Sequence, residues 1–353
     1  MTYKKEDVFE HVKKMKALFA GEMKDRILIH FCIPGPASSV QFFPDIPGMF
    51  GADMDNHRKL SLFRDDFFPS GRPGFGNPYA GFMGGELQSD GCNIWSVPMR
   101  NIYNRLDEVR YNESNPWLAK FIYAMEYYKQ YKPDNFMLAS PSTWGPDDIA
   151  EALRGPEILY DFYDRPEELK ALLWRCADFV LQFRRRVLEL ADRIDGGHIG
   201  WQGFWEPGDC LSLTADTSTN YSAEMFEEFL LPVINYTVDK AGGKCSMHLE
   251  GSSIHIADSL KRINGLLLLQ YTNNPKLPRG IAMMDVLRSK FEDVPLKLLV
   301  TRQELRDGIR DKTLIGNCIY DVGVDAEHLD DYVRTPEEAQ EIMRLAEEYR
   351  AKI

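Results

Sequence analysis

Apolar and polar residues alternate along this chain with the periods of helices and strands. Between residues 5 and 23 the apolar positions recur at spacings of three and four, which predicts an amphipathic helix. The run 26–33 follows it, is rich in β-forming residues and ends at a Pro-Gly-Pro sequence. We therefore predict a strand over this run, followed by a loop.

Beyond residue 116 short apolar runs alternate regularly with helical patterns. Strands are predicted at 136–139, 198–204, 244–249, 266–271, 296–300 and 318–322. The predicted helices between and after them cover 117–131, 166–194, 222–240, 254–262, 281–291 and 336–351. This alternation indicates βαβ units and a parallel sheet that is buried on both faces. Roughly eight such strands favour an α/β fold of the (β/α)₈ (TIM) barrel type over an open sheet.

The region 25–98 breaks this regularity after its first strand. It is dense in glycine, proline and aromatic residues, and we expect an irregular, lid-like segment with a hairpin around Ser89, Asp90 and Gly91. Its aromatic residues are expected to wall an apolar pocket or to plug one end of the barrel: Phe42, Phe43, Phe67, Phe68, Phe75, Tyr79, Phe82 and Trp95. Because no repeat or Ser/Gly-rich linker divides the chain, one domain over 1–353 is expected.

Composition narrows the range of partners. Forty-two basic against 54 acidic residues give a net charge of −12, and a negative field of this size disfavours nucleic acid. The apolar stretches are too short to span a bilayer, and the first residues do not resemble a signal peptide. The six cysteines are scattered without a CxxC pair, as in reduced thiols. We expect a cytoplasmic protein.

Four blocks between residues 150 and 340 resemble the uroporphyrinogen decarboxylase superfamily, in the order found there. They are ALRGPE at 152–157 with YDRPEE at 163–168, YSAEMFEEF at 221–229 with LP at 231–232, MHLEG at 247–251 and TPEEA at 335–339. The resemblance implies a (β/α)₈ barrel with its site at the carboxyl ends of the strands. It also implies one of two chemistries. One is decarboxylation of porphyrinogen acetate groups without a cofactor, and the other is methyl transfer involving corrinoid proteins and thiols, usually with zinc.

The loop after the first strand argues against the porphyrinogen reaction. The decarboxylases of this superfamily carry arginines there, because several buried carboxylates need bidentate cations. The segment 33–39 of this chain contains no arginine. Three later arginines, Arg58, Arg64 and Arg72, are interpreted as surface residues. We therefore expect a member of the superfamily that is not itself a uroporphyrinogen decarboxylase.

The candidate metal ligands are His248 and Glu250. Two residues apart on a predicted strand, they point to the same face and would meet at the barrel mouth. Zinc accepts such nitrogen and oxygen ligands, although many relatives carry H-x-C at this position. Some ether-cleaving relatives have a glutamate 21 positions before the histidine, which corresponds to Glu227, and Cys318 is a further candidate. The alternative interpretation is a hydrogen-bonded pair that orients substrate.

Other polar residues are predicted at the same mouth. Glu206 and Asp216 are candidate catalytic groups beside His248 and Glu250, since a buried carboxylate can act as a general acid or base. The predicted substrate-binding residues are Gln202, Trp205, Gln270, Tyr271, Asn273 and Asp321. Cys32 is interpreted as an inert buried thiol, and His30 as a core histidine.

Three functions remain open from the sequence. The leading hypothesis is a methyltransferase-type enzyme with a small methylated substrate, a corrinoid protein or thiol as the other partner, and zinc as cofactor. The second is a decarboxylase or lyase that acts on a small carboxylate without metal. The third is a non-catalytic ligand-binding member, which would lack a titrating carboxylate in its pocket. A homodimer is left open as the oligomeric state.

Overall fold

A parallel six-stranded sheet forms the centre of the computed structural model, which describes residues 3–33, 45–76, 78–90, 94–323 and 331–351. The strands lie in the order β1-β13-β12-β11-β10-β9, and each pair of neighbours is parallel. Their bounds are β1 (Ile27–Phe31), β9 (Leu211–Leu213), β10 (Cys245–Glu250), β11 (Leu266–Thr272), β12 (Leu296–Val300) and β13 (Cys318–Val322). The predicted α/β class and parallel sheet are confirmed.

Short strands and single backbone contacts extend this sheet at both edges. The strands β2 (Ser70–Gly71) and β5 (Met137–Leu138) pair in parallel. Just before β2, the amide of Asp66 donates to the carbonyl of Ile29 in β1, with an N–O distance of 3.2 Å. Just after β5, Thr143 forms a parallel bridge to Leu213 in β9. The backbone around β2 and β5 is therefore linked to both edge strands of the sheet.

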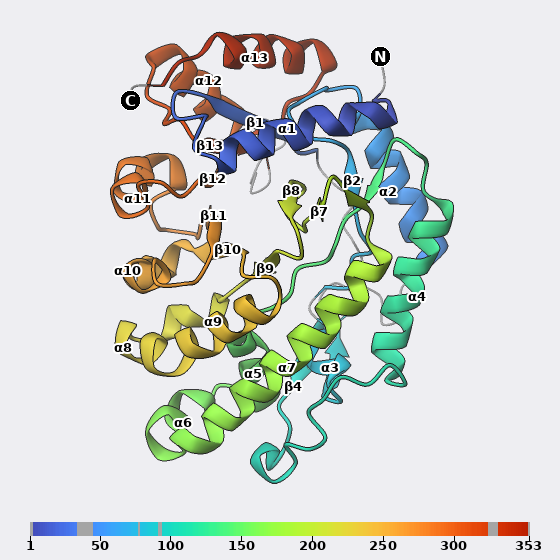
Figure 1. Ribbon diagram of the computed structural model, residues 1–353, viewed down its shortest axis with the longest axis vertical. Helices are drawn as coiled ribbons and strands as arrows, with labels where there is room; N and C mark the ends of the chain where they lie inside the picture. The colour runs from blue at the N-terminus through green and yellow to red at the C-terminus, as the bar shows by residue number, and fades with distance from the viewer. Residues whose placement is uncertain (1–2, 34–44, 77, 91–93, 324–330, 352–353) are drawn as a thin grey trace.

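Helices cover the outer side of these strands, and Figure 1 shows them arranged around the strands. The α-helices are α1 (Val8–Phe19), α2 (Ile46–Leu60), α3 (Tyr79–Phe82), α4 (Pro116–Tyr131), α5 (Pro146–Arg154), α6 (Ile158–Asp164), α7 (Pro166–Leu190), α8 (Ala223–Met225), α9 (Leu231–Lys240), α10 (Ala257–Leu260), α11 (Met284–Lys290), α12 (Arg302–Asp311) and α13 (Pro336–Glu348). Short 3₁₀ turns η1 (Lys5–Asp7), η2 (Ile102–Asn104), η3 (Asp216–Asn220), η5 (Gly251–Ile256) and η6 (Gly280–Met283) and a π-turn η4 (Phe226–Leu230) complete the helical structure. No described helix is both long and apolar enough to cross a lipid bilayer.

Helix α2 corrects the prediction that residues 34–98 are irregular after the first strand. Pro47, Gly48 and Gly51 disfavour a helix interior, and this made the segment look like a loop. Proline is well tolerated in the first turn, however, and the apolar residues that remain recur at helical spacing. Phe50 packs edge-on against Tyr127 and Tyr128 of α4. Packing against α4 thus outweighs the weak local propensity.

The predicted strand at 198–204 is wrong in its length and its sheet. Only β7 (Gly197–Ile199) forms there, and it pairs antiparallel with β6 (Arg193–Ile194) and β8 (Trp205–Pro207). The chain reverses at Gly200–Gly203, where the amide of Gly203 donates to the carbonyl of Gly200. Gly203 has φ +85°, a conformation that favours glycine. The strand that joins the main sheet is β9.

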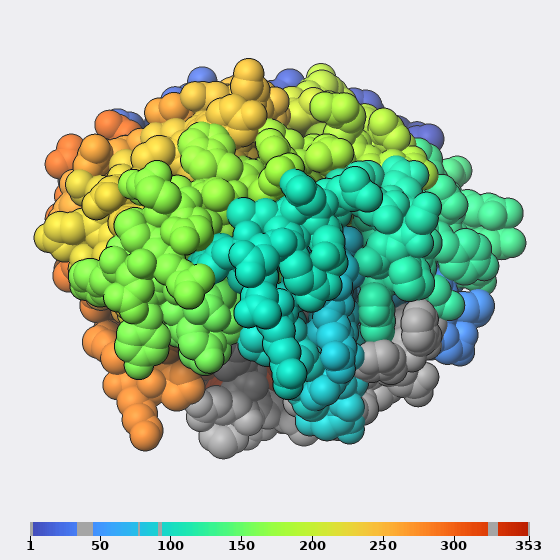
Figure 2. All heavy atoms as spheres, turned by 90° about the horizontal axis from the view of Figure 1, so that it is seen from below, coloured from blue at the N-terminus to red at the C-terminus, as the bar shows by residue number. Residues whose placement is uncertain are grey.

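The predicted hairpin in the lid-like region is confirmed. Strands β3 (Glu86–Ser89) and β4 (Ile94–Val97) pair antiparallel, with Ser89 opposite Ile94. Residues 91–93 lie outside the described part. From below, the segment that contains this hairpin is seen in cyan on the surface of the molecule (Figure 2).

Candidate active site

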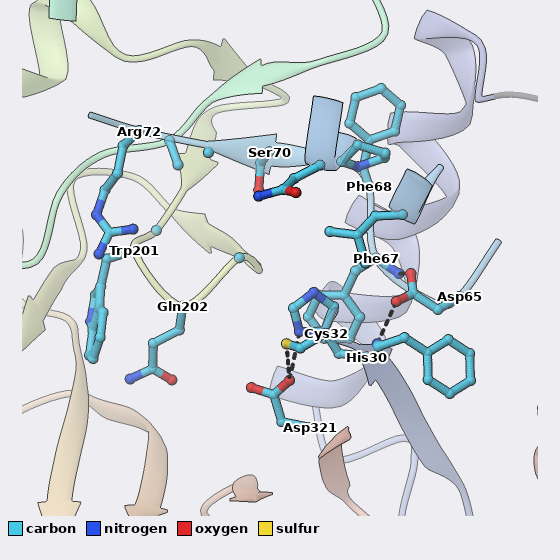
Figure 3. Close-up of a pocket in the computed structure, with 18 of the residues that line it drawn as sticks. His30, Cys32, Asp65, Phe67, Phe68, Ser70, Arg72, Trp201, Gln202 and Asp321 are labelled. Atoms are coloured by element: carbon cyan, nitrogen blue, oxygen red, sulfur yellow. Dashed lines mark hydrogen bonds and ion pairs between the residues drawn. The ribbon is translucent and has the colours of Figure 1, made fainter. Parts of the chain in front are cut away.

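A cavity of about 370 Å³ lies at the carboxyl ends of several strands. Its walls include the residues just beyond β2, β5 and β7, and side chains of β1, β11, β12 and β13 (Figure 3). In parallel α/β folds this end of the sheet is where ligands bind, because loops there are free to carry different side chains. The cavity is therefore the first candidate for a substrate site.

One wall of the cavity carries a charged cluster centred on Asp321. Its Oδ1 accepts a hydrogen bond from Nδ1 of His30 at 2.8 Å and lies 3.4 Å from Sγ of Cys32. Its Oδ2 lies 2.7 Å from Nζ of Lys297, which also donates to the carbonyl of Gln202 at 2.9 Å. Burial alone would raise the pKa of Asp321, but the charge of Lys297 and the interaction with His30 outweigh it and lower the pKa well below its usual value.

The same cluster disfavours ionisation of the Cys32 thiol. Burial raises the pKa of Cys32 well above its usual value, and the charge of Asp321 raises it further. A thiol with a raised pKa is a poor nucleophile at neutral pH. The expectation that Cys32 is inert remains our interpretation, although it lines the cavity and is not enclosed in the core.

A second cluster joins Asp216, His248 and Glu250 (the histidine–carboxylate cluster). Nε2 of His248 lies 3.2 Å from Oε1 of Glu250 and 3.6 Å from Oδ1 of Asp216. His248 and Glu250 are the fourth and last residues of β10, and Asp216 begins η3, the turn after β9. The spacing of two on a strand thus places both side chains on one face, as predicted.

Hydrogen bonds from neighbouring side chains orient this cluster. Nδ1 of His248 lies 3.0 Å from Oε1 of Gln270, the residue opposite it in β11. With Nδ1–H donating to Gln270, Nε2 faces the two carboxylates; it donates to Glu250 when the imidazole is protonated, and it offers a lone pair when the imidazole is neutral. The amide of Asn274 donates to Oε2 of Glu250 at 2.5 Å. The ligand-type atoms of the cluster are therefore held in place by residues outside it.

The pKa values of the cluster are shifted in opposite directions. Burial raises the pKa of Asp216 to about 7, and the charge of Asp148 adds to this rise. Burial alone would lower the pKa of His248, but its hydrogen bond to Glu250 and the charge of Asp216 raise it overall. The hydrogen bond from His248 lowers the pKa of Glu250. Such opposed shifts are frequent at functional sites.

The cluster has the donor set of a metal site. Its three ligand atoms lie within 4.8 Å of one another, and Oδ1 of Asp216 is buried without a hydrogen-bond donor among the described residues. Zinc accepts imidazole and carboxylate ligands, and catalytic zinc sites use three protein ligands and keep one position open. His30, Cys32 and Asp321 form a second group within the same distance. Lys297 lies against that second group, and its positive charge disfavours a cation there.

Trp201 and Gln270 connect the histidine–carboxylate cluster to the cavity. Both line the cavity, and Gln270 bonds to His248. The Trp201 ring packs edge-on against the His248 ring, with 5.8 Å between centroids. The cluster therefore lies at the border of the cavity, behind these two side chains.

Comparison with known structures finds a methyltransferase from Methanosarcina mazei with a TM-score of 0.63. The two sequences are 10% identical, and the match covers 96% of this chain and 98% of the other. At this identity the likeness shows the fold alone. No protein-family model matches the chain, and no curated protein matches its sequence.

Three of the predicted substrate-binding residues line the cavity: Gln202, Gln270 and Asp321. The other three are placed elsewhere. Trp205 is buried in a separate apolar cluster, with Nε1 donating to the carbonyl of Ile194. Tyr271 is in the main core and donates to the carbonyl of Pro278. Asn273 donates to the carbonyl of Leu299 and accepts from the amide of Gly280.

Glu206 lies inside the fold and outside the cavity lining. It is 1% exposed, and both its oxygens accept hydrogen bonds from Ser212, with further bonds to Ser246 and His198. Burial alone would raise the pKa of Glu206, but its bond to His198 and the other neighbours lower it overall. An ionised carboxylate with these partners is suited to holding β8, β9 and β10 together. We leave it out of the proposed catalytic set.

The two further metal candidates also lie outside the histidine–carboxylate cluster. Glu227 forms an ion pair with Arg262 at 2.6 Å and accepts from Ser259. Cys318 is fully buried at the start of β13. Neither belongs to a group of metal-ligand type among the described residues.

Several cavity residues were missed or misread from the sequence. Lys297 lies in the apolar run that predicts β12. The available signal was that it is the single polar residue of this buried strand. Arg72, interpreted as a surface residue, lines the cavity, as does His30, interpreted as a core histidine. Trp201 precedes the predicted Gln202 and had no signal of its own.

The aromatic residues of the lid-like region separate into three groups. Phe67 and Phe68 line the cavity. Phe75, Tyr79 and Phe82 belong to the main core, and Trp95 is 44% exposed on β4. Phe42 and Phe43 lie outside the described residues. The expectation of a pocket wall thus holds for Phe67 and Phe68, and the plugging of a barrel end stays a prediction.

Proposed function

We propose that the protein is a methyltransferase-type enzyme of the uroporphyrinogen decarboxylase superfamily, and that its cavity binds a small methylated substrate. A corrinoid protein or a thiol is the other partner, and zinc is held by Asp216, His248 and Glu250. The observation that carries the proposal is the convergence of these three ligand atoms at the border of the cavity. The structural neighbour, which is named a methyltransferase, supports the same assignment.

The fold that we propose is a closed (β/α)₈ barrel. In it, β2 and β5 complete the ring between β1 and β9. Two carboxylates support closure at β1, where Oδ2 of Asp66 accepts from the amide of Ile29 and Oδ2 of Asp65 accepts from the amide of Phe31, both at 2.7 Å. The Thr143 bridge to β9 supports closure on the other side. The motif blocks at 152–168, 221–232, 247–251 and 335–339 favour the superfamily.

The residues around the cluster have separate tasks in this proposal. Gln270 fixes the His248 ring so that Nε2 faces the ligand position, and Asn274 holds Glu250. Zinc would supply a Lewis acid that polarises an ether or amine or lowers the pKa of a thiol. Trp201 and Gln270 line the larger cavity and contact His248, so they lie between this position and the cavity.

Zinc binding to the purified, chelator-treated protein tests the proposal. Competition with a chromophoric chelator is expected to give one equivalent of zinc. His248→Ala is expected to abolish binding, because it removes the only nitrogen ligand of the cluster. Gln270→Ala is expected to weaken binding by about 10- to 100-fold, since it frees the ring that Gln270 orients.

Two variants act as controls for this measurement. His255→Ala removes an exposed histidine from η5, next to the same strand, and is expected to leave zinc binding unchanged. Cys32→Ser changes the second group of metal-ligand type. If Cys32→Ser abolishes binding and His248→Ala does not, zinc is bound at the other cluster and our assignment is wrong.

Decarboxylation of a small carboxylate without metal is the second candidate function. The observation in its favour is the pKa of about 7 of Asp216, which would let this carboxyl donate a proton at neutral pH. Release of carbon dioxide by zinc-free protein would establish this reaction in place of methyl transfer. We do not propose a non-catalytic role, because Asp65, with its pKa raised by burial to about 6, is a titrating carboxylate in the cavity lining.

A further inference from the structure

Two adjacent cavity side chains have buried polar atoms without a hydrogen-bond partner among the described residues. Nε1 of Trp201 is buried and has no partner among the described residues. The same holds for both polar atoms of the Gln202 side chain, which is only 6% exposed. Native proteins rarely leave buried polar groups unpaired unless a ligand or water satisfies them. Two neighbouring cases in one cavity wall indicate a ligand that accepts hydrogen bonds.

Arg72 adds a positive charge to the same wall. Its guanidinium lies over the Trp201 ring, 5.9 Å from the ring centroid. The charge of Asp53 acts on this guanidinium at longer range, but no described carboxylate forms an ion pair with it. A cation that is removed from water normally has an anionic partner in contact, within the protein or in a ligand. The missing contact partner favours an anionic ligand.

The opposite wall limits the charge of this anion. Figure 3 shows Arg72, Trp201 and Gln202 on one side of the pocket and His30, Cys32 and Asp321 on the other. Asp321 carries a negative charge, because its pKa is lowered, and Asp65 lies on the same side. Lys297 is already paired with Asp321, so a dianion such as phosphate would face one arginine without an ion-pair partner and, across the cavity, the carboxyl of Asp65. A planar monoanion matches the donor fork of a single arginine better.

We infer that Arg72, Trp201 and Gln202 form a subsite for the carboxylate of the substrate. The inference rests on the proposed function for the nature of the reacting group. The Trp201 ring contacts Arg72 on one side and His248 on another. One indole thus separates the carboxylate subsite from the histidine–carboxylate cluster. The substrate is therefore a short molecule, whose methylated oxygen, nitrogen or sulfur lies a few bonds from its carboxylate.

Nuclear magnetic resonance of the tryptophan indoles tests this subsite directly. The chain has six tryptophans, so ¹⁵N-tryptophan labelling gives six indole signals, and Trp201→Phe identifies the one from Trp201. The zinc-free protein is titrated with methoxyacetate, acetate and benzoate, and separately with 2-methoxyethanol. The Trp201 signal is expected to move saturably with the carboxylates, methoxyacetate in particular, and not with the neutral ether.

Substitution of Arg72 gives the second part of the test. Arg72→Gln is expected to weaken methoxyacetate binding by about tenfold to hundredfold, whereas Arg72→Lys retains part of the affinity through its charge. Arg58→Gln, which changes an exposed arginine of α2, is the matched control and is expected to bind normally. An equal shift with 2-methoxyethanol, no saturable shift with any carboxylate, unchanged affinity in Arg72→Gln, or tighter binding of inorganic phosphate would each overturn the inference.

This experiment is independent of the zinc measurement. Carboxylate binding is followed without metal, and His248→Ala is expected to retain it because His248 lies on the far side of the indole. If zinc does not bind but methoxyacetate does, the subsite stands and the methyltransferase assignment falls. If zinc binds and the carboxylates do not, the subsite is wrong and the metal site remains.

Discussion

Asp216 shows how burial changes the chemistry of a single residue. The sequence places it in a loop, where aspartate is usually a cap residue with ordinary acidity. The structure brings it beside His248 and near the buried Asp148, and its pKa rises to about 7. The local sequence contains no sign of this, because the shift depends on α5, which is far from Asp216 in the chain.

Asp147 is more deeply buried and gives a prediction about stability. It is fully buried in the first turn of α5, and one of its oxygens has no hydrogen-bond partner among the described residues. Burial raises its pKa well above the usual value, and the charge of Asp148 raises it further. Below about pH 4 the carboxyl is neutral in both the folded and the unfolded chain. Above that pH only the unfolded chain loses the proton, so folding is progressively disfavoured.

Asp147→Asn is therefore expected to stabilise the protein at pH 7 by more than about 1 kcal/mol and to have little effect at pH 4. Urea unfolding at the two pH values measures the difference in the free energy of unfolding. Asp178→Asn, which changes an exposed acid of α7, is expected to stay within about 0.5 kcal/mol at both. A stabilisation that is equal at both pH values would show that titration of Asp147 is not its cause.

The site residues differ in how far the sequence predicts them. His248 and Glu250 were found because their spacing of two on a strand directly implies a shared face. Gln270 and Asp321 were found because they lie near the carboxyl ends of predicted strands, which are now β11 and β13. Lys297 and Arg72 were not assigned to the site, because their roles depend on partners from other strands. Spacing predicts which way a side chain points, whereas pairing across elements needs the fold.

At the level of elements, helix boundaries follow the capping rules where the local signals agree. At the start of α4, the Asn115 side chain accepts from the amides of Trp117 and Leu118 at 2.9 and 3.2 Å. Its amide nitrogen also donates to the carbonyl of Gly81 near the end of α3, at 2.8 Å. One side chain thus caps α4 and ties it to the short helix α3.

Asn115→Ala is expected to lower the free energy of unfolding by about 1 to 2 kcal/mol, because it removes the cap and the link together. Asn115→Asp keeps an acceptor for the cap and loses only the donation to Gly81, so a smaller loss is expected. Circular dichroism during urea unfolding measures both variants. If Asn115→Asp costs as much as Asn115→Ala, the link to α3, and not the cap, is the stabilising contact.

Glycine is the reason that two elements were predicted wrongly. In α2, Gly48 and Gly51 lower the intrinsic helix propensity, yet contacts with α4 stabilise the helix. At 200–203 two glycines allow a tight reversal inside what looked like one strand. The strands β10, β11, β12 and β13 were predicted nearly to the residue, because buried parallel strands are continuous apolar runs. Local patterns thus predict the sheet better than its irregular edge.

For the whole molecule, the contact between β1 and residues 65–66 decides whether the strands form a closed ring. Carboxylates take the place of backbone carbonyls there, and Asp66 also forms an ion pair with Lys14 of α1 at 2.7 Å. Because Ile29 is fully buried, water cannot replace its acceptor. The sequence contains no signal for the closure that we propose, because it depends on two side chains.

Asp66→Ala is expected to destabilise the protein by about 2 to 3 kcal/mol, because it leaves the Ile29 amide without a partner. Hydrogen exchange measures the effect at the contact itself, and the Ile29 amide is expected to lose its protection. Asp55→Ala, which removes an exposed ion pair on α2, is the control and is expected to have almost no effect. Unchanged exchange at Ile29 would contradict a ring closed at this position.

The position of Lys297 has a practical consequence for redesign. Its ammonium spans from Asp321 to the backbone at Gln202, and its side chain is only 2% exposed, so one residue occupies space between two walls. Substituting a shorter neutral residue together with Asp321→Asn would remove both charges at once and avoid an unpaired acid. The cavity would then gain volume next to the substrate. Larger substrates would fit while the backbones of β12 and β13 stay the same.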